Sequence, residues 1–235
     1  RSSDLPLTNC TIISVTESGI LFVLKELCRK SEDLFHNNKD MIISLAVKLG
    51  RVHILRWIYP NNKLMAKDIS FMLEKAAFYG NIRTITWLYK NFTLPQDYIE
   101  IIKKHGLLGD NVIIIQWLLL KGYNLPTVVE MIKKNAILVV IWMVEYQNIV
   151  LTKKHANLAA KYGSKNILHY CSELDIVCNS DGADEAASSG YLEIIIFLSE
   201  YFNVHVTFSG MRWAAKNGHI EVIRWLIDEQ FTLPA

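Results

Sequence analysis

Three residues with soft metal-ligand chemistry lie close together in the second half of the chain. His169, Cys171 and Cys178 supply one imidazole and two thiols, which are groups that Zn²⁺ prefers in proteins. A structural zinc site needs a fourth ligand, and these three residues leave the set incomplete. We therefore expect packed cysteines and a surface histidine here, and we predict no metal and no other cofactor.

Other patterns that carry chemistry are missing from the sequence. No segment matches the phosphate loops G-x-x-x-x-G-K-[ST] or G-x-G-x-x-G, and no Gly-x-Ser-x-Gly elbow is present. Acidic pairs such as Asp184-Glu185 have the pattern of an ordinary solvated helix surface. Because nothing assembles an acid, a base and a nucleophile, we predict that the chain is not an enzyme and has no small-molecule substrate.

A repeated apolar frame runs through most of the sequence and must position whatever functional residues the chain has. An aromatic residue marks each copy, at separations of 25–30 residues: Trp57, Trp87, Trp117, Trp142, Tyr170, Phe197 and Trp225. Self-similarity at such a period is typical of solenoid proteins, in which each unit buries its apolar face against its neighbours.

Each copy has the pattern of two short helices joined by a tight turn. Seven positions before the aromatic residue stands a helix breaker: Gly50, Gly80, Asp110, Asn135, Gly163, Gly190 or Gly218. Glycine, and after it Asn and Asp, adopts the left-handed backbone that ends a helix. In the Asp110 copy, Gly109 stands beside the breaker, and we expect the turn to shift to that glycine.

The residues around each turn predict how the two helices pack. Paired small residues such as Ala76 and Ala77 precede the turn and let the first helix approach its neighbours. After the turn, apolar residues recur at the spacing of one helix face, and the aromatic residue lies on that face. We therefore expect the aromatic series to be core and not a stacking surface, most clearly at four of its members: Trp57, Trp87, Trp117 and Trp225.

The last copy closely resembles the ankyrin repeat. It reads Ala214-Ala215-Lys216-Asn217-Gly218-His219, followed by an apolar helix in which Trp225-Leu226 stands where Leu-Leu is usual. The resemblance covers roughly residues 41–235, and residues 17–30 look like an eroded unit. We therefore expect an N-terminal segment with an eroded repeat or cap at 1–40 and a repeat array at 41–235.

This resemblance implies an all-α fold, an α-solenoid of about seven stacked helix-turn-helix repeats. The Thr-Pro-Leu-His opening of the family is absent, so the β-hairpins are expected to be short or missing. His219 stands at the conventional histidine position, which implies a local structural hydrogen bond. The short, tryptophan-bearing form of the repeat is similar to ankyrin-like arrays encoded by large DNA viruses and by some protists.

In ankyrin-like arrays the two residues before the turn glycine face the concave groove. Here these positions carry five lysines, three aromatic residues and no acidic residue. A basic, aromatic groove would suit an acidic or phosphate-bearing partner, whereas the alternative is that the lysines are only solvated. The predicted partner-binding residues are Lys48, Phe78, Tyr79, Lys133, Lys134, Lys161, Tyr162 and Lys216.

The resemblance implies a protein–protein interaction module that binds a partner protein along this groove, as a host-interaction or immune-evasion factor if the viral likeness holds. Two alternatives stay open: a structural or assembly scaffold, for example in a virion, and a nucleic-acid-binding solenoid. The net charge of only +2 counts against nucleic acid. Four scattered cysteines predict a reducing, intracellular compartment, the cytoplasm of the cell or of a host. No apolar run reaches the roughly 18 residues of a membrane span, so no membrane is expected.

Overall fold

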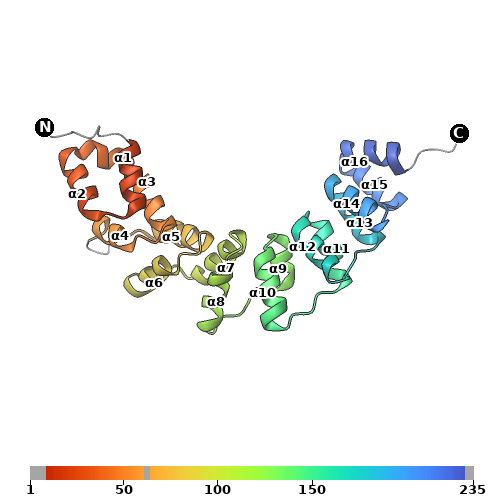
Figure 1. The fold of residues 1–235 in the computed structure, drawn as a ribbon, viewed down its shortest axis with the longest axis horizontal. Coiled ribbons are helices and arrows are strands. Elements are labelled where there is room, and N and C mark those ends of the chain that lie inside the picture. Colours follow the sequence, from red (N-terminus) through yellow and green to blue (C-terminus); the bar gives the residue numbers. More distant parts are fainter. Residues whose placement is uncertain (1–8, 61–63, 231–235) are drawn as a thin grey trace. The chain divides into compact units, whose positions relative to one another are not determined.

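The computed structural model describes residues 9–60 and 64–230, and all regular secondary structure in that part is helical. The predicted all-α class is confirmed there, and the described connectors contain no strand. The elements follow one another in pairs (Figure 1): α1 Asn9–Ser18, α2 Leu21–Lys30, α3 Glu32–Lys48, α4 Val52–Ile58, α5 Ala66–Phe78, α6 Ile82–Asn91, α7 Tyr98–Leu108, α8 Val112–Leu120, α9 Val128–Lys133, α10 Ile137–Gln147, α11 Lys153–Lys161, α12 Lys165–Glu173, α13 Ser180–Ser189, α14 Leu192–Phe202, α15 Phe208–Lys216, α16 Ile220–Trp225 and the π-helical turn η1 Leu226–Gln230.

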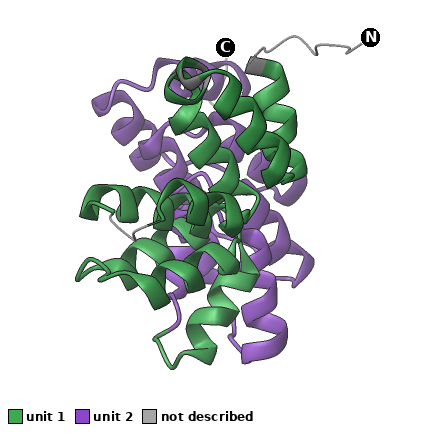
Figure 2. Cartoon of the chain, turned by 90° about the vertical axis from the view of Figure 1, so that its left-hand side faces the viewer, with its two compact units in different colours: residues 1–124 green, residues 125–235 purple. Residues whose placement is uncertain are grey.

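The chain divides into two compact units, residues 1–124 and 125–235 (Figure 2). We call the odd-numbered helix of each pair its first helix and the even-numbered one its second helix. In unit 1 the first helices α1, α3, α5 and α7 pack in sequence, and α4, α6 and α8 form a second row. In unit 2 the first helices α9, α11, α13 and α15 pack in the same way. Within each unit the recurring element is therefore the helix pair that the sequence frame predicts.

The N-terminal region follows the same pattern as the rest of unit 1. Gly19, with φ of +76°, separates α1 from α2, and α1 packs against α3. The boundary expected between residues 40 and 41 falls inside α3. The described part of the chain therefore begins with a further helix pair ahead of the seven that carry the aromatic series.

A left-handed residue ends the first helix of each pair, as the turn chemistry predicts. The turn glycines have φ between +63° and +82°, and Asp110 and Asn135 have φ of +50° and +51°. At Gly80 the N–H of Asn81 donates to the carbonyl of Ala76 (2.7 Å), and the N–H of Gly80 donates to that of Ala77 (3.2 Å). These two bonds satisfy the last helical carbonyls and reverse the chain.

The expected shift of one turn to Gly109 is wrong. Gly109 has φ of −88°, and Asp110 beside it takes the left-handed conformation. A Cβ atom at Gly109 would collide with the backbone carbonyl oxygen of Phe78 in the preceding pair. Glycine is needed at this position because two backbones approach each other closely, and not for its own torsion angles.

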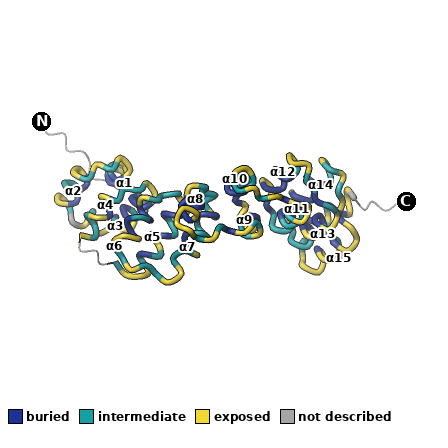
Figure 3. Tube along the Cα trace, turned by 90° about the horizontal axis from the view of Figure 1, so that it is seen from below, coloured by how far each residue is buried: buried dark blue, intermediate teal, exposed yellow. Residues whose placement is uncertain are grey.

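The core of each unit is built from the buried faces of both helices in each pair (Figure 3). The first helices contribute large apolar side chains such as Met72 and Leu73 as well as paired small residues. Ile114, Ile115 and Leu118, which lie three and two positions before the aromatic residue and one after it, are fully buried. Their counterparts in the other pairs are also buried in nearly every case. Ala76 and Ala77 are fully buried as well, where α5 packs against α7.

The aromatic series is core in only part of its length. Trp87 and Trp117 are buried, at 4% and 8% exposure, as predicted. Trp57 and Trp225 are only partly buried, so the expectation is wrong for these two, and Trp142, Tyr170 and Phe197 are likewise only partly buried. Trp57 packs against Phe35 (5.4 Å between ring centroids) at the edge of a cavity of about 520 Å³. Trp225 ends the last α-helix, and no further helix pair of the described chain covers it.

This difference in burial predicts different costs of truncation. We expect Trp87→Ala to lower the free energy of unfolding by about 3–5 kcal/mol, because it empties a large site in the core. Trp57→Ala, the matched control from the same series, should cost clearly less because its indole already faces water. Chemical denaturation of both variants measures the two losses. Equal losses, or a loss below about 1 kcal/mol for Trp87→Ala, would contradict the assignment of Trp87 to the core.

Candidate binding surface

The predicted partner-binding residues all lie at the carboxyl ends of first helices. Each is either the last helical residue or the residue that caps it: Lys48 on α3, Phe78 and Tyr79 on α5, Lys133 and Lys134 on α9, Lys161 and Tyr162 on α11, and Lys216 on α15. Three of them belong to unit 1 and five to unit 2. The two sets are described separately below.

A hydrogen bond from the next helix pair holds several of these helix ends in place. In five pairs the residue after the turn sends its side chain back to a backbone carbonyl at the end of the preceding first helix: Arg51, Asn81, Asn111, Ser164 and His219. Asn81 Nδ2 donates to the carbonyl of Lys48, and Asn111 Nδ2 donates to that of Phe78. In unit 2, His219 Nε2 contacts the Ser188 carbonyl at 3.0 Å. We call this contact the repeat-linking hydrogen bond.

The bond of His219 differs from the sequence-based expectation in its range. A local contact was predicted, whereas the acceptor lies 31 residues earlier in the chain. Asn217 Nδ2 donates to the same carbonyl oxygen at 2.7 Å, so the Ser188 carbonyl at the end of α13 accepts two hydrogen bonds from the next pair. Because a carbonyl oxygen can only accept, Nε2 of His219 carries the proton.

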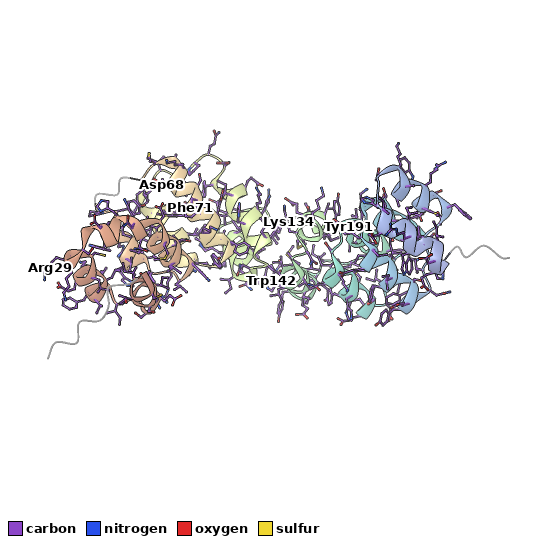
Figure 4. The ribbon with its side chains drawn as sticks, turned by 90° about the horizontal axis from the view of Figure 1, so that it is seen from above. Arg29, Asp68, Phe71, Lys134, Trp142 and Tyr191 are labelled. Carbon is purple, nitrogen blue, oxygen red and sulfur yellow. The ribbon has the colours of Figure 1, made fainter. Side chains whose placement is uncertain are left out.

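The turn glycines leave the space that these linking side chains occupy. A Cβ atom at Gly80 would lie 2.6 Å from Asn111 Oδ1, and one at Gly190 would lie 2.6 Å from His219 Nδ1. At Gly163 the added atom would meet the ring of Tyr191, which is labelled in Figure 4. Gly218 has the same left-handed backbone, with φ of +79°, but nothing lies within 4 Å of an added Cβ. Glycine therefore serves both the turn and the close approach of the next pair.

In unit 1 the predicted residues form an exposed aromatic cluster. Phe78 and Tyr79 pack edge to face, with ring centroids 5.1 Å apart, and Lys48 Nζ lies 5.2 Å from the centroid of the Tyr79 ring. Phe78 is 39% exposed and Tyr79 is 41% exposed. Leu49 and Leu108, at the ends of α3 and α7, are exposed to a similar degree. We call Lys48, Leu49, Phe78, Tyr79 and Leu108 the aromatic patch.

In unit 2 the predicted lysines have different surroundings. Lys133 Nζ lies 5.3 Å from the centroid of the Tyr162 ring, so a lysine and an aromatic residue pair here as they do in unit 1. Lys161 forms an ion pair with Glu185 on α13 (3.1 Å), which offsets part of the predicted basic character. Lys134, labelled in Figure 4, is exposed, and its side chain has no ion pair or ring contact with the residues that the structure describes.

Besides Leu49 and Leu108 of the aromatic patch, one residue of unit 2 at these helix ends is not among the predicted binding residues. Trp213 on α15 is 44% exposed, and the Nζ atom of Lys216 lies 4.7 Å from its ring centroid. Trp213 also lines a cavity of about 470 Å³ between α13 and α15, together with Asp184 and Glu185. The signal was its position three residues before Lys216, which places it on the same helix face one turn earlier.

The cysteines do not form a reactive or metal-binding group in the described structure. Burial raises the pKa of the Cys171 thiol to about 11 and that of Cys178 to about 12, so both stay protonated at neutral pH. His169 instead contacts Glu173 (3.2 Å) and stacks on Phe197. Among the described residues, no group of three or more His, Cys, Asp or Glu side chains could hold a metal ion. No helix in that part of the chain is long and apolar enough to cross a membrane.

Comparison with known proteins adds no further assignment. No family model matches the chain, and no curated protein matches it. The likeness to ankyrin repeats therefore depends on the residues quoted above.

The close approach at the turn glycines predicts unequal costs for the same substitution. Gly218→Ala should lower the free energy of unfolding by about 1–2 kcal/mol, the cost of a left-handed alanine. Gly190→Ala should cost more, because the new methyl group also displaces His219 from the Ser188 carbonyl. Thermal and chemical unfolding of the two variants measure the difference. Equal costs would show that the turn alone requires glycine.

Proposed function

We propose that the chain is an ankyrin-like repeat array that binds another protein through the carboxyl ends of its first helices. The aromatic patch of unit 1 carries this proposal. Five neighbouring positions on three consecutive first helices present four large apolar side chains, each 39–41% exposed, beside one lysine. Exposed aromatic residues that are grouped together are typical of interaction sites, and aromatic side chains dominate binding energy at interfaces.

The way in which the patch is held supports a binding role. The backbone at Lys48 and at Phe78 is fixed by repeat-linking hydrogen bonds from Asn81 and Asn111. The Schellman-type turns fix the same helix ends from the other side. A rigid surface loses little conformational entropy when a partner binds, so more of the contact energy contributes to affinity.

The repeat-like architecture supports the ankyrin-like part of the proposal. Successive helix pairs pack first helix against first helix within each unit, and left-handed turns recur at the predicted positions. An intracellular compartment fits the described cysteines, which are all free thiols. A viral source and a role in the host stay predictions from the sequence resemblance.

The partner is expected to combine apolar and acidic groups. Lys48 beside Phe78 and Tyr79 in unit 1, and Lys133 beside Tyr162 in unit 2, offer ammonium groups next to aromatic rings. Carboxylates of a partner would pair with these lysines, while its apolar side chains would pack on the rings. The Glu185 carboxylate already pairs with Lys161, so we expect the contribution of Lys161 to be small.

The test uses a captured partner and two matched variants. Affinity capture with the chain followed by mass spectrometry identifies the partner, and calorimetry then gives its affinity. We expect Phe78→Ala with Tyr79→Ala to weaken binding by at least about 1–2 kcal/mol, because it removes the exposed aromatic pair. Tyr146→Ala, which truncates a 68% exposed tyrosine on the second helix α10, is the control and should bind like the parent.

Two results would contradict the proposal. The first is a partner that binds the double variant as tightly as the parent while the melting temperatures of both proteins agree. The second is a loss of binding in Tyr146→Ala alone, which would move the interface to the second helices.

A further inference from the structure

Two second helices of unit 1, α4 and α6, carry positive charge that forms no ion pair with the described residues. Arg56 on α4 and both Arg83 and Lys90 on α6 are exposed, and no ion pair in the part of the chain that the structure describes involves them. Neither α4 nor α6 contains an acidic residue. This surface belongs to helices other than those that carry the aromatic patch.

These three cations line one cleft between α4 and α6. Its volume is about 400 Å³, and its remaining walls are Val52, His53, Thr86, Trp87 and Asn91. The lining therefore holds three permanent cations, a histidine and two neutral polar side chains, and no carboxylate. The buried indole of Trp87 and the side chain of Val52 supply its apolar surface.

Two of the polar side chains are already oriented within this cleft. His53 Nε2 contacts the carbonyl of Gly19 at 2.8 Å, so Nε2 donates and the imidazole is held on α4. Asn91 Nδ2 donates to the carbonyl of Trp87 at 2.7 Å at the end of α6. The Thr86 hydroxyl makes no hydrogen bond with the described residues and is therefore available to a ligand.

We propose that this cleft binds a phosphomonoester group. A phosphate dianion offers three strong acceptor oxygens. Two guanidinium groups, an ammonium and a hydroxyl can donate to all three, whereas a carboxylate ligand would offer them only two oxygens and a single charge. The cleft is several times larger than a phosphate ion, so the group that carries the phosphate also lies in it, against Val52 and Trp87. The proposal is independent of the aromatic patch and of the partner proposed for it.

The distribution of charge favours an isolated phosphate group over a nucleic-acid backbone. Helix α8, which packs beside α6, contains no charged residue at all. Lys121 caps this helix, and its Nζ lies 5.9 Å from the centroid of the Tyr89 ring on α6. The helix itself adds no cation, so the positive surface does not continue along α8 as a track for a polymer. Proteins that bind single-stranded nucleic acid without sequence preference need a basic groove that follows several phosphates.

The chain contains a matched control for the arginines of this cleft. Arg224 on α16 and Arg56 on α4 each stand one position before the aromatic residue of their own repeat. Arg224 contacts Glu221 at 3.7 Å, whereas Arg56 has no such carboxylate. Removing the charge of Arg56, which lines the cleft, can therefore be compared with removing that of Arg224, which has the same repeat position outside it.

The experiment follows amide and arginine side-chain signals in ¹H–¹⁵N NMR spectra of the full chain. The probes are inorganic phosphate, phenyl phosphate, a phosphoserine peptide with its unphosphorylated twin, acetate, and a single-stranded oligonucleotide. We expect saturable shifts confined to α4 and α6 with the phosphomonoesters, and weaker binding of acetate and of the unphosphorylated peptide. Tighter binding of phenyl phosphate than of the phosphoserine peptide would indicate that the ligand is a small phosphate ester. Tighter binding of the peptide would indicate a phosphorylated protein side chain.

Arg56→Gln with Arg83→Gln should weaken phosphate-ester binding at least tenfold, while Arg224→Gln leaves it unchanged. Both substituted arginines are exposed and form no ion pair within residues 9–60 and 64–230, so the double variant should fold. Lys90→Gln provides a second test by the same readout. The proposal is overturned if no saturable shift occurs on α4 and α6, if acetate binds as tightly as the phosphomonoesters, or if Arg224→Gln weakens binding equally. Tighter binding of the oligonucleotide would also overturn it, in favour of nucleic acid.

Discussion

Most successive helix pairs share one recurring contact, the repeat-linking hydrogen bond into the carbonyl at the end of a first helix. The last carbonyls of any helix lack partners within it, and leaving them unpaired in a packed array would be costly. The left-handed turn satisfies some of them, and the side chain after the next turn satisfies another. At Gly80 and Gly190 a Cβ atom would meet the linking side chain of the next pair, so a glycine in one pair and a donor in the next act together there. The bond also forms across the Asn135 turn, where Ser164 donates to the Ile132 carbonyl.

The same contact connects the fold to the surface that we assign to binding. The accepting carbonyls belong to residues such as Lys48 and Phe78, whose own side chains form the aromatic patch. Anchoring the backbone at these positions fixes the direction in which the side chains leave it. The variable side chains of the patch can then change without altering the hydrogen bond, because the bond uses only their main chain. At each such residue the main chain therefore contributes to stability, while the side chain is free to contribute to binding.

The helices and turns could be predicted from the sequence because their causes are local. Gly80 and Asn135 are residue types that favour the left-handed backbone, so they predict a turn by themselves. The spacing of Ile114, Ile115 and Leu118 predicts one helix face. The repeat-linking bonds could not be predicted in the same way, because their partners lie about thirty residues apart. The role of Gly109 was missed for the same reason, since only the neighbouring backbone of Phe78 explains it.

Burial and charge pairing also depended on the packing of neighbours. The frame assigns the same role to Trp57 and Trp87, but a cavity beside Phe35 leaves Trp57 partly exposed. Of the predicted binding residues, the sequence indicated correctly that Phe78 and Tyr79 would be exposed together. It did not indicate that Glu185 would pair with Lys161, since the two residues come from different helix pairs. Trp213 lies outside the two positions before each turn that the sequence pattern marks, so the pattern does not indicate it.

Amide hydrogen exchange on an Asn111→Ala variant tests the central role of the repeat-linking hydrogen bond most directly. This change removes the donor to the Phe78 carbonyl, together with the local bond of the same Nδ2 to the Gly109 carbonyl (3.0 Å), and leaves the turn at Gly80 intact. We predict faster exchange at the carboxyl end of α5 and at the start of α6, because the bond to Phe78 is lost, and little change in unit 2. The lost bond to Gly109 acts within the turn after α7 and does not reach α5. Unchanged protection at the end of α5 would contradict the account, since the bond would then contribute nothing to holding the surface in place.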